Sequence, residues 1–152
     1  MGVICSRLVP DCIVLDPPGE SKNEIIHALV TRLASLGQVK DVERLCTDII
    51  AREEMISTCI GFGCAVPHAH SAAVDTTLIA AARLSPARDF AAIDGEAVSL
   101  VFLLAGPRSD AGMHMKLLSK LARLLHDESF RTSLRSARDR DAFYRIICDR
   151  DV

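Results

Sequence analysis

The sequence has no tryptophan and a single tyrosine, and aromatic residues make up only 4% of its 152 residues. Without rows of aromatic side chains, the chain lacks the stacking platforms on which single-stranded nucleic acids bind. It also has no surplus of basic residues, because 18 Lys and Arg face 20 Asp and Glu, for a net charge of -2. Nucleic acids and anionic membrane surfaces are therefore not the expected partners.

Long apolar runs are absent as well. No stretch approaches the roughly 18 uninterrupted apolar residues that a membrane-spanning helix requires, so we expect no direct membrane insertion. The first residues of the chain include Arg7, Pro10 and Asp11, which interrupt any apolar run typical of a secretory signal peptide. We therefore expect a cytoplasmic protein whose six cysteines are reduced thiols.

The remaining composition is that of an ordinary globular protein, with 49% hydrophobic and 25% charged residues, and the length suits one domain over residues 1–152. Ser21 and Glu24 form a capping-box pattern before an apolar helical stripe, and Asp41 is the expected N-cap of a second helix. Helices are predicted over 22–36, 42–55, 111–125, 128–136 and 140–149, and strands over 12–16, 64–66, 76–84 and 98–105. This order indicates an α/β fold in which helices cover a central sheet.

The most informative segment ends on Pro67 and His68. The three residues before Pro67 are small or β-branched and predict a buried strand, which proline cannot continue, so we expect His68 to leave the sheet at a defined angle. A neutral imidazole has one nitrogen free to act as a nucleophile and can accept a phosphoryl group. Arg52, Ser57 and Thr58 could hold phosphate oxygens if the loop that carries the two hydroxyls folds back.

With this segment the chain resembles the type 2 (fructose–mannitol) enzyme IIA domains of the bacterial phosphotransferase system, which include the nitrogen-regulatory enzyme IIA proteins. The family pattern is filled by Glu53, Ile60-Gly61, Phe62-Gly63 and Cys64-Ala65-Val66-Pro67-His68-Ala69. Only Cys64 departs from it, where an aliphatic side chain is usual. The resemblance extends through 90–95 and 113–118 and covers roughly residues 12–149. It implies a mixed sheet of about five strands flanked by helices.

The resemblance also implies roles for individual residues. Nε2 of His68 would accept the phosphoryl group, and His114, near the start of the helix from residue 111, would lie against it as a neutral hydrogen-bond donor. Arg52, Ser57 and Thr58 would contact the phosphate. The implied donor is the phosphocarrier protein HPr or its nitrogen-branch paralogue, the implied recipient is an enzyme IIB or a regulatory target protein, and no cofactor is required.

A carrier that must dissociate quickly suits a small, weak interface. We therefore expect an apolar docking surface around His68, with Phe62, Val66 and Ala69 near its rim. The sequence does not distinguish the sugar-transport branch of the family from its regulatory branch. A regulatory or binding module that keeps the fold without transferring phosphate is the alternative function.

Two site residues also have simpler interpretations. His114 shares a helix face with leucines and would fit a core histidine that is hydrogen-bonded to backbone. Arg52 would fit a solvated helix end on which it pairs with a carboxylate.

A zinc site is the remaining alternative. It would use two thiols and two imidazoles within twelve residues, Cys59, Cys64, His68 and His70. Alternation of side chains along a strand argues against this set, so no metal is expected.

Overall fold

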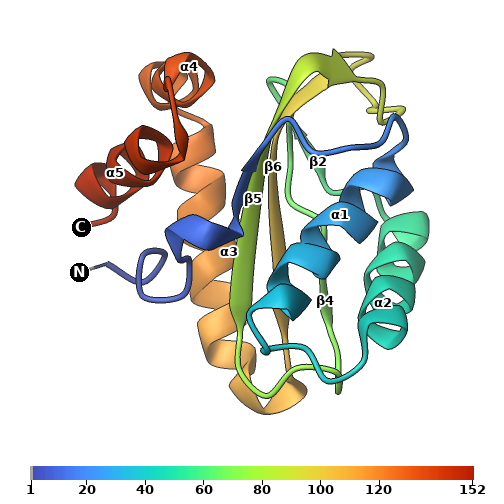
Figure 1. The fold of residues 1–152 in the computed structure, drawn as a ribbon. Coiled ribbons are helices and arrows are strands. Elements are labelled where there is room, and N and C mark those ends of the chain that lie inside the picture. The colour runs from blue at the N-terminus through green and yellow to red at the C-terminus, as the bar shows by residue number, and fades with distance from the viewer. Residues whose placement is uncertain (1) are drawn as a thin grey trace.

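A mixed sheet of six strands forms the centre of the structure, with helices packed on both of its faces (Figure 1). The computed structural model describes residues 2–152, which is the whole predicted domain 1–152 apart from Met1. The predicted α/β class is confirmed, and the sheet has one strand more than the expected five or so. The strands are β1 (Ile13–Leu15), β2 (Cys59–Gly61), β3 (Cys64–Ala65), β4 (His68–His70), β5 (Leu78–Arg88) and β6 (Val98–Gly106).

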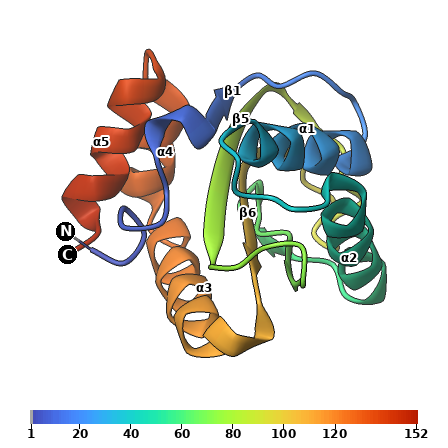
Figure 2. The same cartoon turned by 60° about the horizontal axis from the view of Figure 1, so that its bottom comes forward.

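The helices form two layers, which Figure 2 shows from a second direction. One layer consists of α1 (Lys22–Ser35) and α2 (Val42–Met55), and the other of α3 (Ala111–Leu125), α4 (Glu128–Ser136) and α5 (Arg140–Arg150). Two 3₁₀ turns, η1 (Pro10–Cys12) and η2 (Arg108–Asp110), precede β1 and α3. The predicted capping box is present, because the Ser21 hydroxyl accepts from the Glu24 N–H and the Glu24 carboxylate accepts from the Ser21 N–H. The predicted N-cap Asp41 likewise accepts from the Arg44 N–H.

The two longest strands, β5 and β6, pair antiparallel at the centre of the sheet. Their apolar runs are continuous because helices cover both faces, so that 79–82 on β5 and 100–105 on β6 have no exposed surface. On one side β5 pairs with β1, and on the other side β6 pairs with both β3 and β4, all three in parallel. β2 completes the sheet antiparallel to β3.

The chain does not leave the sheet at Pro67. After this proline, β4 resumes parallel pairing with β6, with His68 opposite Leu104 and His70 opposite Gly106. The expectation that His68 departs from the sheet is therefore wrong. The proline only interrupts the ladder, since its carbonyl still accepts a hydrogen bond from the Leu104 N–H at 2.9 Å.

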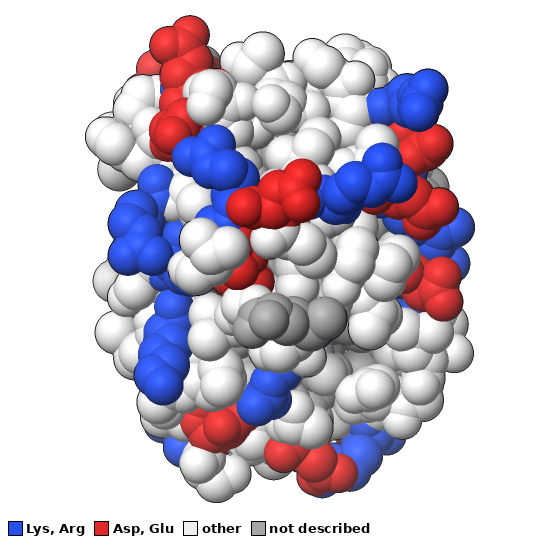
Figure 3. All heavy atoms as spheres, turned by 90° about the vertical axis from the view of Figure 1, so that its left-hand side faces the viewer, with Lys and Arg blue, Asp and Glu red and all other residues white. Residues whose placement is uncertain are grey.

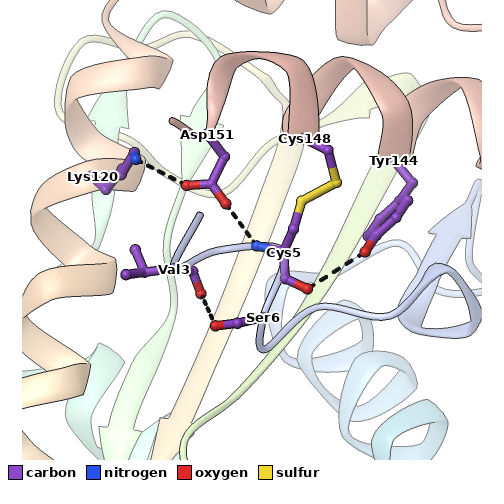
Figure 4. Close-up of a disulfide and its surroundings, with 7 residues drawn as sticks. All are labelled: Val3, Cys5, Ser6, Lys120, Tyr144, Cys148 and Asp151. Carbon is purple, nitrogen blue, oxygen red and sulfur yellow. Dashed lines mark hydrogen bonds and ion pairs between the residues drawn. A yellow bond between two sulfur atoms is a disulfide. The ribbon is translucent and has the colours of Figure 1, made fainter. Parts of the chain in front are cut away.

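The expectation of six reduced cysteines is wrong for two of them. The segment before β1 lies beside α5, so that the Cα atoms of Cys5 and Cys148 come within 5.8 Å of each other and the two residues form a disulfide (Figure 4). The other four cysteines, at 12, 46, 59 and 64, are free.

The surface seen in Figure 3 carries basic and acidic side chains next to one another. Among residues 2–152, no helix combines the length and the apolar character needed to cross a membrane.

Candidate active site

Three histidines meet where β4 faces the beginning of α3. His68 and His70 are two residues apart on β4, so their side chains emerge on the same face of the strand. His114 is the fourth residue of α3, which begins shortly after β6, the strand that pairs with β4. The ring centroid of His114 lies 5.7 Å from that of His68 and 4.4 Å from that of His70.

His68 is held in one tautomer by the backbone. Its Nδ1 lies 2.7 Å from the carbonyl oxygen of Val66. A carbonyl can only accept a hydrogen bond, so Nδ1 carries the proton and Nε2 keeps its lone pair. Because His68 is only half-buried, this nitrogen is the nucleophile that the site can offer.

His114 is buried, with 2% of its surface exposed, and its Nδ1 has no hydrogen-bond partner within residues 2–152. Burial, followed by the neighbouring His70 and His68, lowers the pKa of His114 to about 4. At neutral pH the ring is therefore uncharged, as expected from the sequence. The unpaired Nδ1 argues against the alternative interpretation, in which a core histidine donates or accepts a hydrogen bond with the backbone at this atom.

A cavity of about 540 Å³ opens beside these rings. Its walls include all three histidines, Arg52 from α2 and Arg108 from η2. Neither arginine has a carboxylate within 4.0 Å anywhere in the described chain, so both guanidinium groups are free to hold an anion. The solvated ion pair considered for Arg52 is thus not formed.

The acidic residue of the motif, Glu53, holds the loop that precedes His68. Glu53 is buried on α2, and its carboxylate accepts hydrogen bonds from the Thr58 N–H at 3.1 Å and from the Thr58 hydroxyl at 2.5 Å. Lys22 from α1 contributes a third contact, 3.2 Å from its Nζ to the same carboxylate. The Thr58 carbonyl in turn accepts from the Val66 N–H at 3.0 Å. Glu53 therefore connects through the backbone to the residue that fixes the His68 ring.

The structure gives the two predicted loop hydroxyls other partners. The Thr58 hydroxyl is buried and donates to Glu53, and the Ser57 hydroxyl accepts from the Cys59 N–H at 3.3 Å. Neither residue lines the cavity with the three histidines. Phosphate contacts by Ser57 and Thr58 would thus require these bonds to be exchanged.

Two residues in the cavity wall were not predicted as part of the phosphoryl-transfer site: Arg108, and His70, which was considered only as a ligand of the alternative zinc site. For His70 a signal was present in the sequence, because residues i and i+2 share a face wherever the chain is a strand. It was missed because the strand was expected to stop at Pro67. Arg108 follows β6 in a 3₁₀ turn, and no local pattern connects it with His68.

The apolar rim of the cavity also differs from the predicted one. Val66 and Ala69 are buried, with 4% and 6% of their surfaces exposed, so they cannot form a docking surface. Phe62 is half-exposed, but its ring packs against other side chains, with the Arg131 guanidinium 4.2 Å from its centroid. The large exposed apolar residues in the cavity wall are Met55 and Met115, with 77% and 61% of their surfaces exposed.

The alternative zinc site is not assembled. Burial raises the pKa of the Cys64 thiol to about 11 and also raises that of Cys59, which disfavours the thiolates that bind zinc. In the part of the chain that the structure describes, no group of three or more His, Cys, Asp or Glu is arranged to hold a metal ion.

Known proteins resemble this chain over nearly its whole length. The family model for the phosphoenolpyruvate-dependent sugar phosphotransferase system, EIIA 2, matches residues 7–149. The nitrogen regulatory protein of Bradyrhizobium diazoefficiens is 33% identical over 146 residues, which cover 95% of this chain and 94% of that protein. The 2-O-alpha-mannosyl-D-glycerate-specific EIIABC component of Escherichia coli is 39% identical over 142 residues, which cover 92% of this chain. The matched region spans only 22% of the length of that protein.

Solved structures share the fold over nearly the whole chain. The nitrogen regulatory protein IIA-Ntr from Neisseria meningitidis has a TM-score of 0.88 at 31% identity, over 95% of this chain and 99% of that one. The mannitol IIA protein of E. coli has a TM-score of 0.77 at 23% identity, over 93% and 99%. Domains of this kind are phosphotransfer relay proteins. The chain belongs to the type 2 enzyme IIA family of the phosphoenolpyruvate-dependent sugar phosphotransferase system.

Proposed function

We propose that this protein accepts a phosphoryl group on Nε2 of His68 from a phosphohistidine of a carrier protein and passes it to an acceptor. The observation that carries the proposal is the bond from His68 Nδ1 to the Val66 carbonyl, which leaves the other ring nitrogen free as a nucleophile. As the new bond from Nε2 to phosphorus forms, the phosphorus–nitrogen bond of the carrier breaks, and its electron pair returns to the imidazole of the carrier. His68 keeps its Nδ1 proton throughout.

The cavity supplies the charge stabilisation that such a transfer needs. The phosphoryl group carries negative charge on three oxygens, and catalysis depends on positioning and electrostatics more than on covalent assistance. Arg52 and Arg108 line the cavity beside His68 without competing carboxylates. His114, neutral at physiological pH, can donate one hydrogen bond without adding a charge that would retain the group.

We assign the donor role to the phosphocarrier HPr or its nitrogen-branch paralogue, and the acceptor role to an enzyme IIB or a regulatory target protein. A complex of mannitol IIA with phosphorylated mannitol IIB is among the structures that share this fold, with a TM-score of 0.76 at 21% identity. The exposed Met55 and Met115 give the cavity a small apolar rim, as suits a partner that must dissociate quickly. The cytoplasmic location inferred from the sequence is part of the same proposal.

The test is phosphorylation in a reconstituted relay of phosphoenolpyruvate, enzyme I and each of the two carriers in turn. Intact-mass analysis should show one added phosphoryl group, labile in acid and stable in base, and His68→Ala should abolish it. Arg52→Met should slow labelling roughly tenfold or more, as loss of one donor to a developing charge typically does. Arg123→Met, an exposed arginine on α3 outside this cavity, is the matched control.

Two results would contradict the proposal. Undiminished labelling of His68→Ala would place the acceptor elsewhere. A wild-type protein that no carrier labels would favour the alternative of a module without transfer.

A further inference from the structure

His70 is the closer neighbour of His114, although His68 is the nucleophile. The His70 and His114 ring centroids lie 4.4 Å apart with the ring planes tilted by 36°, whereas His68 is 5.7 Å away and meets His114 edge-on. The His70 side chain is itself half-buried, and its Nδ1 is fully enclosed with no hydrogen-bond partner in the described chain. Its contact with His114 is therefore a packing contact between rings and not a hydrogen bond through Nδ1.

His70 also stands between two cavities. It lines the cavity of His68 and His114 and a second cavity of about 360 Å³, which Arg44, Ser71 and Ser109 line on its other sides. His114 does not line the second cavity. Asp48 and Arg108 line both cavities as well, and His70 is the residue of this shared wall whose ring packs on His114.

We propose that His70 is a positioning residue for His114: its ring fixes the orientation of the His114 imidazole and shields it from water, so that His114 meets the phosphoryl group as a neutral donor. The consequence for catalysis rests on the proposed function. A charged imidazolium would stabilise the phosphorylated ground state more than the transition state, and would therefore slow onward transfer.

The charged groups around His114 do not take over the positioning of its ring, which is left to the neighbouring rings. On α2, Asp48 accepts a hydrogen bond from the Ser71 hydroxyl at 2.6 Å and pairs with Arg44 at 3.1 Å. Arg52, also on α2, is a cation. From η2, Arg108 is a second cation. Burial and the two β4 histidines outweigh the remaining carboxylate in lowering the pKa of His114.

That carboxylate is Asp110, which favours the charged form of His114. It is itself engaged by the Thr77 hydroxyl at 2.7 Å and by Arg7 at 3.4 Å. Because the negative charge of Asp110 is shared among these partners, Asp110 does not offset the effect of burial on the pKa of His114.

Three substitutions separate the ring of His70 from the presence of a cation at this position. His70→Phe keeps a flat ring without ring nitrogens, His70→Lys places a positive charge there without a ring, and His70→Ala supplies neither. The first readout is the NMR titration of the His114 imidazole in the unphosphorylated protein, which is independent of any relay. The second is the rate of phosphoryl transfer to and from His68, with circular dichroism to verify folding.

We expect His70→Phe to keep the His114 pKa well below 6.5 and to transfer within about threefold of wild type, because an aromatic ring preserves the packing. In His70→Ala the His114 pKa should rise by about one unit or more as water reaches the ring, with transfer at least about tenfold slower. His70→Lys should slow transfer as much as His70→Ala, because charge alone does not orient the ring. If the alanine variant does not fold, His70→Leu fills the space without a flat ring and takes its place.

The proposal is overturned if His70→Ala leaves both the His114 titration and the transfer rate unchanged, or if His70→Phe behaves like His70→Ala. If the wild-type protein accepts no phosphoryl group, the proposed function fails. The titration arm then still decides whether His70 controls His114.

Discussion

Reduction of the Cys5–Cys148 disulfide should lower the free energy of unfolding without disturbing the active site. The bond joins the segment before β1 to α5 across 143 positions of sequence (Figure 4). Around it, the Cys5 N–H donates to the Asp151 carboxylate at 2.8 Å, and Asp151 pairs with Lys120 at 3.0 Å. These contacts and the buried Ile4 and Leu8 hold the segment in place when the bond is broken, so the effect falls mainly on the unfolded chain.

The size of the effect follows from the length of the loop that the bond closes. Chain entropy predicts about 5 kcal/mol for a loop of this length, whereas native disulfides typically contribute about 2–4 kcal/mol. We therefore expect a loss of about 3 kcal/mol, which in a chain of this size corresponds to a fall of about 6–12 °C in Tm.

The assay is urea unfolding followed by circular dichroism, with and without a phosphine reductant. Thiol titration of the unfolded, unreduced protein should find four free thiols, matching the four cysteines outside the bond. Cys148→Ser should unfold at the lower midpoint in both conditions, and the reductant should not change it further. Equal midpoints for the oxidised and reduced wild-type protein would refute the reasoning, as would six free thiols in the protein before reduction.

Two further predictions concern Glu53 and His114. Glu53→Gln should lower the free energy of unfolding by about 2 kcal/mol, because it replaces a buried, charge-assisted acceptor. It should also speed amide hydrogen exchange at Thr58. The control is Glu54→Gln at the exposed neighbouring position, and equal effects of the two substitutions would contradict the role of Glu53. The folded-state pKa of His114, about 4, lies below its ordinary 6.5, so its contribution to stability is complete above 6.5 and is lost as the pH falls toward 4. Urea unfolding should therefore show that the free energy of unfolding falls by about 2 kcal/mol between neutral pH and roughly pH 5. His114→Gln should remove this loss, whereas the exposed control His27→Gln should retain it. A loss that persists in His114→Gln would assign the titration to another group.

The helices were predictable because their signals are local. The Ser21–Glu24 capping box and the Asp41 cap are each contained within four residues, and the observed α1 and α2 begin directly after Ser21 and Asp41. The two central strands were predictable for a related reason, since strands covered by helices on both faces need continuous apolar runs. In each case the sequence alone contains the interaction that determines the structure.

The features that were missed depend on partners distant in sequence. β4 forms after Pro67 because β6 offers it a parallel partner, and nothing within three residues of His68 reveals that partner. The disulfide depends on the segment before β1 lying beside α5. Arg108 enters the cavity only because η2 connects the end of β6 to the start of α3.

The position of the acidic residue in the motif has a physical explanation in this structure. Arg52 and Glu53 are consecutive on α2 and point about 100° apart around the helix, so Arg52 lines the cavity while Glu53 is buried against the loop. The Thr58 N–H donates to the Glu53 carboxylate, the Val66 N–H donates to the Thr58 carbonyl, and His68 Nδ1 donates to the Val66 carbonyl. Each step fixes the backbone group that makes the next, and the last one selects the tautomer of His68. One turn of α2 therefore supplies both a cation that faces the cavity and the anchor that orients the His68 ring.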